Sequence, residues 1–202
     1  MKIVDRTNGL ATDALLDSNR PGSSVANIGD LNGDGVAELA VGATGDDTGG
    51  SDRGAVHVLF LNKLGTVESS VKIADGIGGL AAETLKNGDG FGGAVTSVGD
   101  LDGDGINDLA VGADRDDEGD NSSGAVHVLF LNDDGTVQNF TKIASDTGGG
   151  PTLANGDRFG HSVTAIGDLN DDGITDLVVG AFRDSTGGLQ RGALYVVLLS
   201  PL

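Results

Sequence analysis

The sequence predicts an all-β protein made of repeated, four-stranded antiparallel sheets. Glycine accounts for 36 of the 202 residues and proline for only 3, a composition typical of many tight turns rather than of a collagen-like or disordered chain. The apolar segments between the glycines have strand length and show no sustained helical period. The whole pattern also occurs three times along the chain, which indicates a repeat architecture.

Each repeat contains four candidate strands in the same order. In the first repeat they lie around residues 24–30, 38–43, 54–62 and 65–74. The third of these segments, GAVHVLFLN, recurs unchanged at 124–132 and returns as GALYVVLLS at 192–200. Four short antiparallel strands form one β-propeller blade. We therefore expect one propeller domain over residues 1–202, with three blades formed by the repeats 2–71, 72–141 and 142–202.

The two ends of the chain complement each other. The third repeat stops at LLSPL without its fourth strand, whereas MKIVD at the start has the sequence of a fourth strand without a preceding partner. Propellers have four to eight blades, so three blades do not close a circle. We expect a homodimer that forms a six-bladed ring, in which the N-terminal strand, Lys2 to Asp5, completes the last blade across the seam. A fragment of a longer propeller is the alternative.

The charge of the chain excludes some classes of partner. The formal net charge is −19, with only 12 Lys and Arg residues, so nucleic acid and anionic membrane surfaces are not expected partners. No apolar run is long enough to insert into a membrane. Cations are the natural counterpart of such a chain.

An acidic hairpin joins the first two strands of each repeat. Oxygen-bearing side chains stand at positions 1, 3, 5 and 9 of DLNGDGVAE and its two copies, and position 7 can add a backbone carbonyl. The expected ligands are Asp30, Asn32, Asp34, Val36 and Glu38 in the first hairpin, Asp100, Asp102, Asp104, Ile106 and Asp108 in the second, and Asp168, Asn170, Asp172, Ile174 and Asp176 in the third.

This ligand pattern favours calcium. An all-oxygen site with several carboxylates suits a hard cation that accepts six to eight ligands at ~2.3–2.6 Å. Position 12, which is a bidentate Glu in an EF-hand, is Val41, Val111 or Val179 here, so the sequence predicts a β-hairpin site rather than a helix-loop-helix. Turn formation alone explains Asp, Asn and Gly less well, because clustered carboxylates repel one another unless a cation neutralises them. We expect three Ca²⁺ ions per chain.

The repeats resemble a known family, the FG-GAP repeats of the integrin α-subunit β-propeller and their bacterial relatives. The residues that carry the resemblance are FGGAVTSVGDLDGDGINDLAVGA from Phe91, FGHSVTAIGDLNDDGITDLVVGA from Phe159 and PGSSVANIGDLNGDGVAELAVGA from Pro21. The resemblance implies that the hairpins hold calcium on one face of a propeller, while loops on the opposite face present ligand-binding residues. Those loops are 44–53, 114–123, 182–191, 87–92 and 155–160.

These observations predict a calcium-binding module for binding or adhesion, in which the metal has a structural role. A protein or glycan would bind on the face opposite the calcium loops, and the family implies an extracellular or cell-surface location, with the signal peptide absent from this form. We do not expect an enzyme, because the only histidines are His57, His127 and His161 and the best clustered carboxylates are assigned to metal. The alternatives are a self-assembling scaffold without a ligand, either recently amplified or engineered, a lectin, and an enzyme in the central channel.

Overall fold

The computed structural model describes residue 3, residues 19–117 and residues 122–200. These residues form strands, turns and loops but no helix, and hence no helix that is long and apolar enough to cross a bilayer. The expected all-β class is confirmed. The strands are β1 (Pro21–Gly29), β2 (Glu38–Ala43), β3 (Ala55–Leu61), β4 (Val67–Ala74), β5 (Ala94–Gly99), β6 (Asp108–Ala113), β7 (Ala125–Leu131), β8 (Val137–Ile143), β9 (Phe159–Gly167), β10 (Asp176–Ala181) and β11 (Ala193–Val197).

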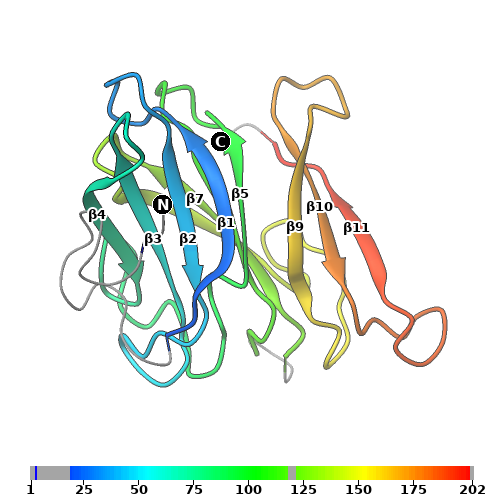
Figure 1. Cartoon of the computed structure of the whole chain (residues 1–202). Helices are drawn as coiled ribbons and strands as arrows, with labels where there is room; N and C mark the ends of the chain where they lie inside the picture. The colour runs from blue at the N-terminus through cyan, green and yellow to red at the C-terminus, as the bar shows by residue number, and fades with distance from the viewer. Residues whose placement is uncertain (1–2, 4–18, 118–121, 201–202) are drawn as a thin grey trace.

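The strands form three antiparallel sheets that follow the three repeats (Figure 1). The first sheet has the order β1-β2-β3-β4, the second β5-β6-β7-β8, and the third β9-β10-β11. Every connection within a sheet joins neighbouring strands, as in a propeller blade. We call the sheets the first, second and third blades. The closed six-bladed ring stays a prediction.

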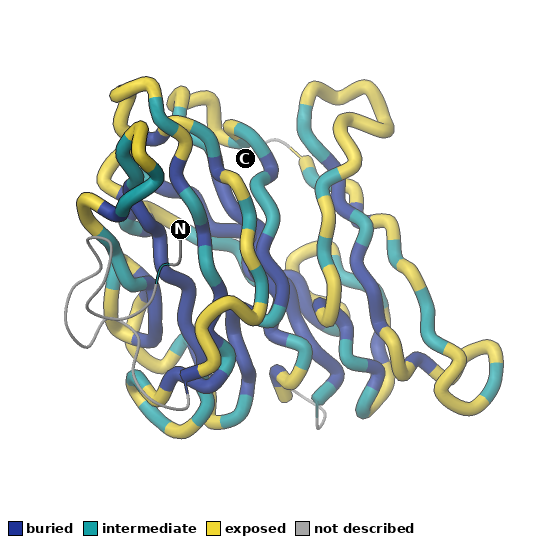
Figure 2. The backbone as a smooth tube through the Cα atoms, in the orientation of Figure 1, coloured by how far each residue is buried: buried dark blue, intermediate teal, exposed yellow. Residues whose placement is uncertain are grey.

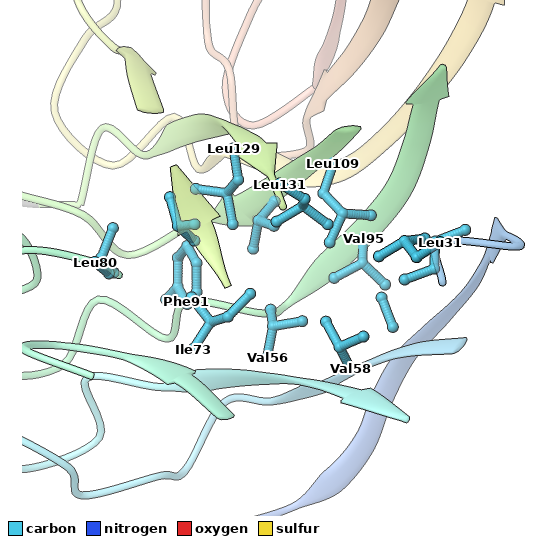
Figure 3. Close-up of a cluster of buried hydrophobic side chains, with 14 of the residues drawn as sticks. Leu31, Val56, Val58, Ile73, Leu80, Phe91, Val95, Leu109, Leu129 and Leu131 are labelled. Atoms are coloured by element: carbon cyan, nitrogen blue, oxygen red, sulfur yellow. The ribbon is translucent and has the colours of Figure 1, made fainter. Parts of the chain in front are cut away.

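The blades stack face to face because their strands are apolar on both sides. Strands β6 and β7 of the second blade are buried at every residue. One apolar cluster joins the first and second blades through residues such as Val56, Val58 and Leu109 (Figure 3). A second cluster joins the second and third blades through residues such as Val128 and Leu177. The first strands of successive blades, β1, β5 and β9, also contact one another.

Close contact between blades depends on glycine at one repeated position. A Cβ atom at Gly42 would collide with the backbone oxygen of Gly92, and one at Gly112 would collide with that of Gly160. Neither of these strand glycines can therefore carry a side chain without moving the next blade away.

The third blade lacks a fourth strand among the described residues. In the second blade, Val137 begins the fourth strand, and its N–H donates to the oxygen of Gly78 at 2.8 Å. Gly148 and Gly149 are the residues equivalent to Gly78 and Gly79 at the interface between the second and third blades. An apolar cavity of about 220 Å³ lies beside them. The strand expected at residues 2–5 lies outside the described residues except for Ile3, which packs against Leu59 and Val67 of the first blade.

Candidate metal centre

The three acidic hairpins lie at the same end of the blades. Each connects the first and second strand of its blade, and the three connections project along the upper rim in Figure 1. In every hairpin the residues at positions 1, 3 and 5 are exposed, whereas the residue at position 9, which begins the second strand, is buried. The side-chain oxygens at the first three positions are thus accessible to solvent ions.

The aspartate at position 1 curls each hairpin around its own carboxylate. Asp100 accepts hydrogen bonds from the N–H groups of Gly103 at 2.7 Å and Gly105 at 2.9 Å. Asp30 likewise accepts from Asp34 and Gly35, and Asp168 from Asp172 and Gly173. The glycine at position 6 has a positive φ of 93° at Gly105, which a residue with a side chain rarely adopts.

Positions 3, 5 and 7 are held by short-range hydrogen bonds. The oxygen of Asp102 accepts from the N–H of Asp104 at 3.2 Å, and the carboxylate of Asp104 accepts from the N–H of Ile106 at 2.8 Å. The other hairpins repeat this arrangement with Asn32, Asp34 and Val36, and with Asn170, Asp172 and Ile174. Each hairpin therefore has a curled backbone that carries its oxygens close together.

The carboxylate at position 9 ties the hairpin to the blade. Asp108 accepts hydrogen bonds from the N–H of Leu101 at 2.9 Å and from that of Leu131 at 3.0 Å. Asp176 accepts in the same way from Leu169 and Leu199. Burial raises the pKa of Asp108 to about 6, with a further contribution from the charges of Asp102 and Asp104 and opposition from the two N–H groups.

Glu38 differs from its two counterparts. Its Oε2 atom accepts from the N–H of Leu31 at 2.7 Å, but its Oε1 atom is buried and has no hydrogen-bond partner among the described residues. Burial raises the pKa of this carboxyl group, and the charges of Asp34 and Asp30 add to the effect. A buried carboxylate oxygen without a partner is costly, and a bound cation would remove that cost.

The second hairpin brings three acids together as a potential metal site. One carboxylate oxygen from each of Asp100, Asp102 and Asp108 lies within 4.8 Å of the others. Such a set of hard oxygen donors fits a calcium ion. Among the described residues this is the one group of three or more acidic or histidine ligands found so close together. In the first and third hairpins position 3 is Asn32 or Asn170, which supplies an amide oxygen instead of a charge.

The loops at the opposite end of the blades have an anchoring role that the sequence analysis missed. Asp46, Asp116 and Asp184 belong to the loops expected to present ligand residues, yet each is at most 2% exposed. Asp46 lies 2.6 Å from the Nζ atom of Lys72, and Asp116 lies 2.9 Å from that of Lys142. Recurrence of an aspartate three residues after each GA could have indicated this structural role.

The histidines lie away from the acidic hairpins. His57 and His127 are buried in β3 and β7, and burial lowers the pKa of His57, with a further effect of the Lys72 charge. His161 is exposed, with its Nδ1 atom 3.2 Å from Asp114.

Comparison with known proteins relates all three blades to one family. Residues 21–59, 91–129 and 159–197, together more than half of the chain, match the family model described as FG-GAP repeat. The chain is 33% identical to human integrin alpha-IIb over 178 residues, which is 86% of this chain and 15% of the relative. It is 30% identical to Xenopus laevis integrin alpha-4 over 169 residues (84% and 15%) and 30% identical to Caenorhabditis briggsae integrin alpha pat-2 over 200 residues (96% and 15%). The chain thus spans about one seventh of the length of these relatives.

Proposed function

The chain belongs to the FG-GAP repeat family and is similar to integrin α-subunits, and from this premise we propose that it is a calcium-binding propeller module for binding or adhesion. The observation that carries the proposal is the group formed by Asp100, Asp102 and Asp108, whose oxygens lie within 4.8 Å of one another in an exposed hairpin. The same hairpin occurs in all three blades.

The proposed metal role is structural. The residues that would hold one ion in each blade are those at positions 1, 3, 5 and 9, with a backbone carbonyl at position 7. A bound calcium ion would neutralise the mutual repulsion of the clustered carboxylates. The chain itself supplies the rest of the site: the N–H groups curl each hairpin, and the buried carboxylate at position 9 fixes the hairpin to its blade.

The proposed ligand surface is at the opposite end of the blades. Loops 44–53 and 87–92 lie together there, because the N–H groups of Gly88, Gly90 and Phe91 donate to the oxygens of Ser51, Asp52 and Arg53. Arg53 further contacts Asp75 at 2.6 Å. Loops held in this way can present their exposed side chains to a protein or a glycan. The proposed role is binding without catalysis, at an extracellular location or on a cell surface.

Thermal unfolding with and without a chelator tests the structural metal role. A ligand that binds the folded state alone stabilises it by mass action, so excess EGTA should lower the melting temperature of the calcium-loaded protein. Magnesium added in place of calcium should restore the melting temperature less well, because it prefers strict octahedral geometry. An unchanged melting temperature in EGTA would show that the hairpins need no ion.

A further inference from the structure

One face of the third blade exposes an apolar surface that has buried counterparts in both other blades. Leu194, Val196 and Leu198 are 76%, 55% and 54% exposed, and Ile166 is 41% exposed. Val196 faces Val178 on the neighbouring strand and Leu194 faces Gly180, so these side chains lie on one side of the sheet. We call this surface the open face of the third blade; Figure 2 shows exposed segments along β9 and β11.

In the other two blades the same face is covered by the next blade. The residues equivalent to Ile166, Leu194, Val196 and Leu198 are at most 7% exposed there. They are Ile28, Val56, Val58 and Phe60 in the first blade, which pack on the second, and Val98, Val126, Val128 and Phe130 in the second blade, which pack on the third. The open face therefore has the chemistry of a blade-to-blade interface.

The first blade has the complementary uncovered face. Val25 is 58% exposed, and Leu39 and Val41 are half-buried. Their equivalents in the second blade are Val95, Leu109 and Val111, which are buried against the first blade. The first blade thus exposes the kind of surface that the open face of the third blade would need.

Asn19 and Ile3, which precede the first blade in the sequence, contact it in the same way as the equivalent residues contact the later blades. The N–H of Gly45 donates to the oxygen of Asn19 at 3.0 Å, as the N–H groups of Arg115 and Arg183 donate to the oxygens of Asp89 and Asp157. Ile3 packs with Leu59 and Val67 of the first blade, as Ile73 packs in one cluster with Leu129 and Val137 of the second.

We propose that the open face of the third blade binds the first blade of a second copy of this chain, and that the second copy binds back in the same way. Two chains with three blades each then form a six-bladed ring, which lies within the four to eight blades of known propellers. Each contact continues the series of interfaces that already joins the blades within a chain.

The third blade shows a specific adaptation at this edge. In the first two blades the buried Asp46 and Asp116 pair with Lys72 and Lys142 of the fourth strands β4 and β8. In the third blade the equivalent Asp184 accepts a hydrogen bond at 2.6 Å from the hydroxyl of Tyr195, which replaces the histidine of the other blades. Asp184 thus has a hydrogen-bond partner within its own blade and does not need one from a second copy.

The mass of the calcium-loaded protein in solution tests the proposal, with multi-angle light scattering and native mass spectrometry at about 0.15 M salt. This ionic strength limits repulsion between two acidic chains. The expected mass is 40.2 kDa, twice the 20.1 kDa of one chain. The double variant Leu194→Asp, Val196→Asp should shift the mass to that of one chain, whereas the control Leu64→Asp, at a turn residue that is 83% exposed, should leave it unchanged. A single-chain mass for the unchanged protein, or a mass of three or more chains, would overturn the proposal.

Two further variants test the geometry of the contact. Within one chain, a methyl group at Gly180 would collide with the side-chain oxygen of Ser162, which must rotate away, and would lie at an ordinary 3.8 Å from the backbone oxygen of Ser162. Gly180→Ala should therefore change the melting of one chain little while it separates the copies, because a Cβ atom at the equivalent Gly42 or Gly112 would collide with the backbone of the next blade. Val25→Asp alters only the first blade and should also give single chains. A two-chain mass that survives Val25→Asp would indicate pairing of two third blades and would contradict the proposal. The number of bound calcium ions per chain should be the same in all these variants, so failure of the calcium proposal is distinguishable from failure of this one.

Discussion

Asp108 accepts a hydrogen bond at 2.9 Å from the backbone N–H of Leu101, seven residues earlier in the chain, and thereby closes the acidic hairpin. The same carboxyl group accepts a second hydrogen bond from Leu131 on β7. One side chain thus links the hairpin to two strands of the blade. We therefore expect changes at the hairpin to affect the stability of the sheet.

Removal of one ligand should remove one ion. Asp100→Ala deletes the position-1 carboxylate of the second hairpin, which also holds Gly103 and Gly105. We expect this variant to bind one calcium ion fewer per chain than the unchanged protein, as counted by native mass spectrometry. The matched control is Asp133→Ala, which removes an exposed acid from the β7–β8 turn; an equal loss of calcium there would contradict the site assignment.

Asp89 should make stability depend on pH. Burial raises its pKa to about 6, and the charges of Asp116 and Asp117 add to this effect. Because the ordinary pKa of an unfolded aspartate is about 3.9, the folded protein takes up a proton between pH 7 and pH 5 that the unfolded chain does not. The contribution of this group to stability therefore rises as pH falls through about 6.

The variant Asp89→Asn isolates that contribution, because its amide oxygen can still accept from the N–H of Lys86. We expect urea denaturation to show the variant more stable than the unchanged protein at pH 7, by roughly 1 to 3 kcal/mol, with a smaller difference at pH 5. Asp133→Asn serves as the exposed control. If the difference in the free energy of unfolding between the variant and the unchanged protein did not change with pH, the pKa of Asp89 would not be raised in the folded state.

Phe91 should be a large contributor to the interface between the first two blades. It is fully buried and meets the ring of His127 edge to face at 5.4 Å. Phe91→Ala should lower the free energy of unfolding by about 3–5 kcal/mol, since it removes a buried ring and leaves a cavity. Pro21, at the same repeat position of the first blade, is exposed, and Pro21→Ala should change stability by at most about 1 kcal/mol. Similar effects for both variants would contradict the packing described.

Gly112 should tolerate no side chain. Its substitution by alanine would force a methyl group against the backbone oxygen of Gly160 in the third blade. Overpacking of this kind costs about 1–3 kcal/mol, which chemical denaturation would measure. Gly93→Ala is the control, because the nearest atom to its methyl group would lie at an ordinary 3.4 Å. Equal stability of the two variants would show that the blades can separate without cost.

The repetition of the sequence explains why so much of the fold could be predicted. GAVHVLFLN forms the largely apolar, buried third strand in two blades, and the acidic hairpin lies between the first and second strands as expected. The roles of individual acids were harder to predict. Asp46 and Asp100 both stand in loops rich in Asp and Gly, but Asp46 is buried and pairs with a lysine more than twenty residues away, whereas Asp100 is exposed. Composition and spacing do not separate the two, because burial depends on contacts between distant segments.

The unpartnered oxygen of Glu38 was also beyond prediction from the sequence. Its Oε1 atom is buried and has no hydrogen-bond partner among the described residues, which the residue type and its spacing do not indicate. In the other hairpins the equivalent oxygen meets the N–H of Leu131 or Leu199. The first site thus differs from the other two in the hydrogen bonding of its position-9 carboxylate.

The most direct test of the calcium-site proposal is the number of calcium ions bound per chain in native mass spectrometry after equilibration with about 1 mM calcium, the range in which extracellular calcium modules bind, with an EGTA-treated sample as reference. The account predicts three ions per chain, and two for the Asp100→Ala variant. A chain that carries no calcium under these conditions, while it keeps the β-sheet circular dichroism of the EGTA-treated sample, would contradict it.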